Sequence, residues 1–128
     1  MRYADNAFRF LHGTPNVPGM YAARSGYEIV NEVGVEKIRA KSVRQTERLI
    51  ELAREAGFTM KSPPFESRGG TVILDVPNGA AIVQELARRD FLMDHRPGAG
   101  IRLAPHFYTA NEELELTIRE IVKVKASL

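Results

Sequence analysis

The sequence predicts an α+β fold in which a small antiparallel or mixed sheet is covered on one side by helices. Two long segments with helical periodicity open the chain, and short alternating or apolar segments typical of strands follow, interleaved with two further helical patterns. The order helix, helix, strand, strand, helix, strand, strand, helix is typical of helices gathered on one face of a sheet. At 128 residues, 44% of them hydrophobic, the chain has the size of one domain with a core.

The first helix is expected to begin at Thr14, which can cap it, with Pro15 at its first position, where a missing N–H is harmless. Gly34 is expected to end it. One apolar face is then formed by Met20, Ala23, Tyr27 and Val30. The second helix is expected over residues 35–56, stopping at Gly57, with a length of roughly 33 Å at 1.5 Å per residue.

Four cations line one face of the middle of the second helix: Lys37, Lys41, Arg44 and Arg48. Three glutamates offer local partners: Glu47, Glu51 and Glu55. We interpret this face as solvated. The alternative is a nucleic-acid-binding stripe, which predicts steeply salt-dependent retention on DNA. Eighteen Lys and Arg against sixteen Asp and Glu leave a net charge of only +2, which favours the solvated face and no nucleic-acid partner.

The clearest strand pattern covers residues 70–76, where Val72, Leu74 and Val76 alternate with Thr71, Ile73 and Asp75. Three shorter segments are also expected to be strands, at residues 58–60, 91–93 and 101–104. Between them, Asn78 can cap a helix that runs to Arg89. The side chains of Ile82, Val83 and Leu86 are expected to face the core.

The last helix is expected to start with a capping box formed by Thr109 and Glu112 and to run to about Lys125. Its predicted buried face consists of Leu114, Ile118, Ile121 and Val122. Before it, residues 96–100 form a turn rich in proline and glycine.

Composition excludes several classes of site and protein. Cysteine is absent and the three histidines are scattered, so neither a disulfide nor a metal site is expected. No apolar run approaches the ~20 residues that span a bilayer, and no signal-type segment follows Met1. A soluble, cytoplasmic protein without a membrane partner is expected.

Arg102 is the most informative candidate for a binding residue, because it lies in a short strand-like segment between Ile101 and Leu103. A partly buried arginine requires an anion, and its planar guanidinium binds a carboxylate through two parallel hydrogen bonds. From spacing alone, a structural ion pair is the alternative, with three possible partners: Asp75, Asp94 and Glu112.

Other candidates are weaker. Gly98 and Gly100 would allow a backbone to approach a ligand closely. His106 and Tyr108 lack a neighbouring nucleophile or carboxylate pair and are not expected to be catalytic. Asp94, His95 and Arg96 form a charged cluster that is expected to be a local salt bridge. Gly13 and Thr14 form a corner before a helix that resembles a small anion-binding site, although ordinary capping is the more frequent role.

Three segments, taken in order, resemble the C-terminal part of class V aminotransferase-type enzymes that depend on pyridoxal 5'-phosphate, and within that group kynureninase. They are RFLHGTPNVPGMYAA at residues 9–23, RGGTVIL at residues 68–74 and DHRPGAGIRLAPHFYTANEEL at residues 94–114. The resemblance covers nearly the whole chain. It implies the fold of the C-terminal domain of fold-type I pyridoxal-phosphate enzymes, with residues 1–15 as a connection from a large domain and residues 16–128 as the small domain.

The resemblance implies specific roles. Arg102 would bind the α-carboxylate of an amino-acid substrate, and Thr14 with Gly13 would contact the cofactor phosphate of a neighbouring subunit in a homodimer. Residues 68–70 and 94–97 would be mainly architectural.

The sequence departs from the family in two respects. The Schiff-base lysine and the aspartate that pairs with the cofactor's ring nitrogen belong to a large domain that these residues do not include. None of five lysines, namely Lys37, Lys41, Lys61, Lys123 and Lys125, stands in the lysine motif, so no tightly bound cofactor and no turnover are expected from this chain alone. The segment after Arg102 also resembles the broader aminotransferase group more than kynureninases.

The leading hypothesis is therefore a C-terminal fragment of a kynureninase-like enzyme, with hydrolysis of kynurenine to anthranilate and alanine as the favoured reaction of the parent. An aminotransferase, a cysteine desulfurase or an epimerase of the same family is the alternative parent. A rival hypothesis is a free-standing α+β module that captures a small carboxylate through Arg102 without catalysis.

Overall fold

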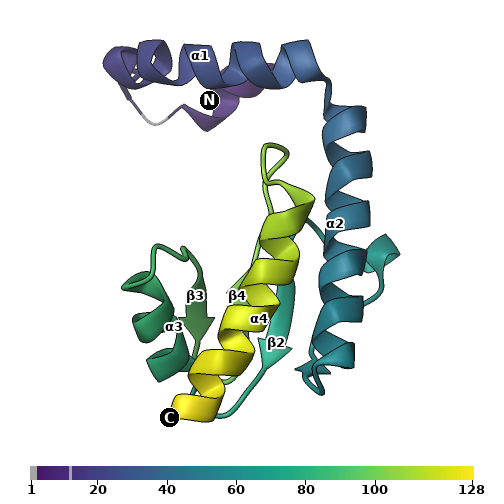
Figure 1. Cartoon of the computed structure of the whole chain (residues 1–128). Coiled ribbons are helices and arrows are strands. Elements are labelled where there is room, and N and C mark those ends of the chain that lie inside the picture. The colour runs from purple at the N-terminus through teal and green to yellow at the C-terminus, as the bar shows by residue number, and fades with distance from the viewer. Residues whose placement is uncertain (1–2, 12) are drawn as a thin grey trace. The chain divides into compact units, whose positions relative to one another are not determined.

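The computed structural model describes residues 3–11 and 13–128 and divides into two compact units, Met1–Val35 and Glu36–Leu128 (Figure 1). Residues 1, 2 and 12 of the expected connection lie outside the described residues. In order, the elements are η1 (Ala7–Phe10), α1 (Val17–Val33), α2 (Val35–Glu55), β1 (Thr59–Met60), η2 (Phe65–Ser67), β2 (Val72–Asp75), α3 (Gly79–Ala87), β3 (Asp94–Arg96), β4 (Gly100–Leu103) and α4 (Asn111–Ser127). The predicted α+β class is confirmed.

Helix α1 begins later than predicted, and its cap is Asn16 rather than Thr14. The Asn16 side-chain oxygen accepts a hydrogen bond of 3.0 Å from the backbone N–H of Gly19. Glycine suits this position, because a Cβ at residue 19 would lie only 2.7 Å from the Asn16 amide. Pro18, in the first turn, takes the role expected of Pro15. Gly34 ends the helix as predicted, with a positive φ of 89°.

Helix α2 matches its prediction within one residue, and the chain reverses at Gly57, whose φ is +76°. The N–H of Phe58 bonds the Ala53 carbonyl at 2.9 Å, which closes the helix end. Its buried side chains are Gln45, Thr46, Leu49, Ile50 and Ala53. No helix in the described part of the chain is long and apolar enough to cross a membrane.

The sheet has the strand order β1-β2-β4-β3, and every neighbouring pair is antiparallel. Val72 pairs with Leu103 and Leu74 with Ile101. All four of these side chains are at most 5% exposed, so they define the inner face of the sheet. Because side chains alternate along a strand, Arg102 and its partner on β3 lie on the opposite, outer face.

Helices cover the inner face, and α4 crosses in front of β2 and β4 in Figure 1. The core they enclose includes Leu49 and Ala53 of α2, and Ile82 and Leu86 of α3, as predicted for the latter pair. The buried residues of α4 are Leu114, Ile118, Ile121 and Val124. The prediction of Val122 in this face was wrong: it is 41% exposed. Val124 lies inside instead, one turn after Ile121.

The predicted strand at residues 91–93 was wrong by three residues, since β3 is Asp94–Arg96. The hairpin turn decides this register: the N–H of Ala99 bonds the Arg96 carbonyl at 3.0 Å, which pairs Arg96 with Gly100 and fixes the pairs before it. Phe91 and Met93 pack against the core from a connecting segment, without pairing in the sheet.

The start of α4 also differs from prediction. Ala110 is the cap residue, and the Glu113 carboxylate accepts a hydrogen bond of 2.6 Å from its N–H. The Thr109 hydroxyl instead accepts a hydrogen bond of 2.9 Å from the N–H of His106. The predicted Thr109–Glu112 capping box was therefore wrong by one residue, because Thr109 closes the preceding turn.

Candidate carboxylate-binding site

Arg102 lies on the outer face of the sheet and forms a bidentate ion pair with Asp94, its direct partner across the β3–β4 hairpin. Arg102 Nε donates to Asp94 Oδ1 and Nη2 donates to Oδ2, both at 2.6 Å. Of the three ionic partners that spacing allowed, the structure selects Asp94. Asp75 instead pairs with Lys61, with an Nζ–Oδ1 distance of 3.1 Å.

Arg96 completes the cluster, with its Nη2 3.2 Å from Asp94 Oδ2. The predicted local salt bridge in this segment is thus present. The Arg102 and Asp94 side chains are 40% and 42% exposed, and that of Arg96 is 57% exposed, so solvent reaches all three. Two guanidinium groups face one carboxylate.

The charges of this cluster stabilise one another. The hydrogen bond from Arg102 lowers the pKa of Asp94, and the nearby charges of Arg102 and Arg96 act in the same direction against partial desolvation. The same hydrogen bond raises the pKa of Arg102. Asp94 is therefore ionised and Arg102 charged at neutral pH.

The two glycines of the hairpin, Gly98 and Gly100, are explained by backbone conformation and strand packing. A Cβ on Gly100 would lie 2.1 Å from the Leu74 carbonyl oxygen, and φ at Gly100 is +134°. The close approach that sequence reasoning attributed to a ligand is here the approach of β4 to β2. At Gly98, φ is +75° but the space around an added Cβ is open, so only the turn conformation favours glycine there.

Two residues of α2 hold the loop that follows Arg102. Lys41 Nζ donates to the Phe107 carbonyl at 2.7 Å. Gln45 Nε2 donates to the Thr109 carbonyl at 2.8 Å and to Asn111 Oδ1 at 3.1 Å. The interpretation of this helix face as solvated was wrong for Lys41, and Gln45 was missed. Gln45 lies one turn before buried Leu49, so the spacing could have revealed it.

Arg48 of the cationic face agrees with the predicted local pairing. Arg48 lies 3.3 Å from Glu51 and 4.0 Å from Glu55, as the sequence indicated. It also contacts Glu115 of α4 at 3.2 Å.

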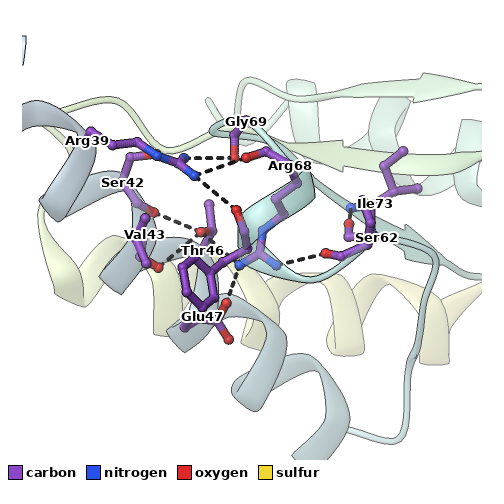
Figure 2. Close-up of polar contacts among 11 residues, drawn as sticks. Arg39, Ser42, Val43, Thr46, Glu47, Ser62, Arg68, Gly69 and Ile73 are labelled. Atoms are coloured by element: carbon purple, nitrogen blue, oxygen red, sulfur yellow. Dashed lines mark hydrogen bonds and ion pairs between the residues drawn. The ribbon is translucent and has the colours of Figure 1, made fainter.

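Arg68 fastens the loop between β1 and β2 to α2 (Figure 2). Its side chain is only 4% exposed; Nη1 donates to the Pro63 carbonyl at 2.9 Å, and Nη2 contacts the Thr46 hydroxyl at 3.2 Å and the Glu47 carboxylate. Arg39 donates to three carbonyls of the same loop, those of Phe65, Arg68 and Gly69. These contacts are the kind expected of an architectural segment.

A partly open cleft of about 600 Å³ is lined by Met93, by Leu103 of the inner face of the sheet and by Leu114 of α4, and neither Arg102 nor Asp94 is among its lining residues. Its rim carries His106 and Tyr108, whose rings lie 4.3 Å apart between centroids.

Gly13 and Thr14 belong to the other unit, Met1–Val35. Both are exposed, and φ at Gly13 is +96°. The structure leaves the Thr14 hydroxyl outside the cap of α1, since Asn16 supplies that contact.

Comparison with solved structures shows that this fold also occurs as a part of longer chains. A cysteine desulfurase from Thermococcus onnurineus NA1 matches with a TM-score of 0.81 and 18% identity over 99% of this chain and 36% of its own. A NifS-like protein matches with a TM-score of 0.73 and 22% identity, over 100% of this chain and 39% of its own.

Sequence comparison identifies the family. The model of the kynureninase C-terminal domain matches residues 38–121. A kynureninase from Bacillus anthracis is 32% identical over 127 residues, and an uncharacterized aminotransferase from Bacillus subtilis (strain 168) is 30% identical over 119 residues. The chain belongs to the kynureninase C-terminal domain family, as the motifs predicted. These matches cover 94% and 93% of this chain, but only 30% and 32% of the length of the two relatives.

Proposed function

We propose that this chain is the C-terminal portion of a kynureninase-like, pyridoxal-phosphate-dependent enzyme, in which Arg102 binds the α-carboxylate of an amino-acid substrate. The proposal rests on the guanidinium of Arg102, which is accessible to solvent and is held in place by its ion pair with Asp94. It belongs to a cluster of two arginines and one aspartate. A planar guanidinium orients a carboxylate as well as attracting it, so it would fix the rotation of the substrate about Cα.

Four of the five lysines make contacts that do not suit a Schiff-base role. Lys41, Lys61 and Lys123 bind, respectively, the Phe107 carbonyl, Asp75 and Glu120, and Lys125 lies 5.0 Å from the centre of the Phe58 ring. Together with the share of the relatives' length that the chain covers, this supports a cofactor held by a separate large domain. The chain alone would be inactive and would not hold the cofactor tightly.

Thr14 and Gly13 suit a supporting role. An exposed hydroxyl beside a glycine with positive φ can contact a phosphate, and α1 begins at Val17, three residues after Thr14. We propose that they contact the cofactor phosphate in a neighbouring subunit of a homodimer.

The exposed apolar surface of the first unit supports an interface with a protein partner. No residue of α1 is buried, and large apolar side chains are exposed on this unit, among them Phe8, Phe10, Met20, Tyr21 and Tyr27. Apolar surface of this extent is typical of a protein interface. Residues 1–15 would connect to the large domain, and the enzyme would be cytoplasmic.

Hydrolysis of kynurenine to anthranilate and alanine is the reaction we favour for the complete enzyme. An aminotransferase, a cysteine desulfurase or an epimerase would use the same carboxylate contact. The chemistry at the reacting atoms would then be set by residues outside this chain.

Two measurements on the isolated chain test the proposal. After addition of pyridoxal phosphate, we expect no stoichiometric absorbance band that responds to amino acids; such a band would contradict the assignment of the cofactor site to another domain. Calorimetry with amino and keto acids should show no micromolar binding. Micromolar affinity would instead support the free-standing carboxylate-binding module.

A further inference from the structure

We infer that Arg96 is a second carboxylate-binding residue and that Asp94 is a positioning residue, so that a substrate carboxylate binds the free ends of two guanidinium groups while Asp94 stays in place. This inference rests on the proposed carboxylate role of Arg102. It goes further in assigning the contact to a cluster of three residues.

The hydrogen bonds of Arg102 leave a second binding edge open. A guanidinium carries five N–H donors, and the Nε–Nη2 edge of Arg102 is occupied by the two oxygens of Asp94. The Nη1–Nη2 end still presents two parallel N–H groups, which match a second carboxylate. Binding there requires no break in the ion pair with Asp94.

Arg96 is placed to join that contact. It follows Asp94 by two residues on β3, so its side chain lies on the same outer face. Its Nη2 lies 3.2 Å from Asp94 Oδ2, and the side chain is 57% exposed. A guanidinium has five N–H donors, and this exposure leaves part of the Arg96 group open to an incoming anion.

The charge balance also favours an anion here. Arg96 and Arg102 together carry two positive charges against the single negative charge of Asp94. The other charged pair of the outer face, Lys61 with Asp75, is internally balanced. His95 faces inward, where its ring lies 2.7 Å from the position of a Cβ on Gly79.

Displacement of Asp94 by substrate is the competing arrangement. It would break two hydrogen bonds of 2.6 Å between residues that sheet register already places opposite each other. A carboxylate from solution gains no better contact on that edge and must also be immobilised. The free end of the guanidinium is therefore the favoured position.

Chemical shifts of arginine side chains in the isotope-labelled chain test this arrangement, with sodium propionate as the carboxylate probe and sodium chloride at equal ionic strength as the reference. We expect propionate to move the Cζ resonances of Arg102 and Arg96 together. The Arg102 Nε–H resonance, bonded to Asp94, should stay in place. In Asp94→Asn, propionate should move this Nε–H resonance, because the edge is no longer held by a carboxylate.

The Arg96→Gln variant should weaken propionate binding at Arg102 by about two- to fivefold, the range for exposed ion pairs. Arg102→Gln should abolish the shift at Arg96, and Arg119→Gln, on the exposed surface of α4, should change nothing. Unchanged affinity in Arg96→Gln, with binding at Arg102 intact, would overturn this inference and leave the proposed function standing. A propionate-induced shift of Nε–H in the wild type would overturn the positioning role of Asp94. Absence of any shift at Arg102 would overturn this inference alone, because the proposed function expects no tight carboxylate binding by the isolated chain.

Discussion

The ammonium group of Lys41 donates a hydrogen bond of 2.7 Å to the carbonyl of Phe107, a residue 66 positions further along the chain. This contact ties α2 to the loop between Arg102 and α4. We expect Lys41→Met to lower the free energy of unfolding by about 1 kcal/mol, because one hydrogen bond is lost. Hydrogen exchange of the amides at residues 106–109 should become faster. Lys37→Met, one turn earlier on an exposed part of α2, is the matched control and should leave exchange in this loop unchanged.

Gly100→Ala should be among the most damaging substitutions in the chain. Its Cβ would lie 2.1 Å from the Leu74 carbonyl oxygen, so β2 and β4 would have to separate. We expect a loss of more than about 3 kcal/mol in urea unfolding, or failure to fold. Gly98→Ala, in the same turn but with open space, should lose only about 1 kcal/mol for its positive φ. Equal losses in the two variants would contradict the close packing at residue 100.

Arg68→Ala should loosen the loop between β1 and β2. The side chain is 4% exposed, and its removal would leave the Pro63 carbonyl and the Thr46 hydroxyl without this donor. We expect destabilisation of about 2 kcal/mol. Arg54→Ala, on an exposed part of α2, should have little effect on the urea midpoint and so controls for loss of an arginine.

Acid should weaken the β3–β4 hairpin through Asp94. Because the folded-state pKa of Asp94 lies below its ordinary value of 3.8, its stabilising contribution is complete above that value. The contribution disappears as pH falls through the lower, folded-state pKa. At pH 7, Asp94→Asn should be less stable than the wild type, and the difference should shrink in acid. Carbon NMR of the Asp94 carboxyl group checks the cause, and a titration midpoint at or above 3.8 would contradict it.

Asn16→Ala should reduce the helicity of α1, since the cap hydrogen bond to Gly19 is lost, with a cost of about 1 kcal/mol. Thr14→Ala should leave helicity unchanged. Circular dichroism of both variants separates the observed cap from the one that the sequence suggested. Loss of helicity in Thr14→Ala alone would be evidence against Asn16 as the cap.

Periodicity predicted the helices and the central strand well, because the inner positions of β2 and the inward residues of α3 follow simple apolar spacing. It failed at residues 91–93, where apolar side chains pack against the core from a connecting segment. Register there follows from the hydrogen bond between Ala99 and Arg96, which apolar spacing does not encode. The predicted cap of α1 also failed: Thr14 and Asn16 are both good cap residues, but a helix capped by Asn16 places Pro18 in the first turn, where its missing N–H costs nothing.

The ion pair at the candidate site was predicted in part, and the binding role of Arg102 stays a prediction. Sequence identified Arg102 and named Asp94 among its possible partners, because strand and turn spacing limited the choice. The sequence could not predict the bidentate geometry of this ion pair, which depends on direct cross-strand pairing. It also missed the role of Lys41 and Gln45, since the partners of both are backbone or side-chain groups more than 60 positions away.

The β3–β4 hairpin specifies two properties of the molecule at once. A shift of one residue between these strands would turn Arg102 toward the hydrophobic interior and Ile101 toward solvent. A change in the length of the turn at residues 97–99 would therefore alter the position of the Arg102–Asp94 ion pair and thermodynamic stability together. If Arg102 has the proposed carboxylate role, divergence of specificity is expected to proceed through substitution of side chains around this turn rather than through insertion or deletion within it.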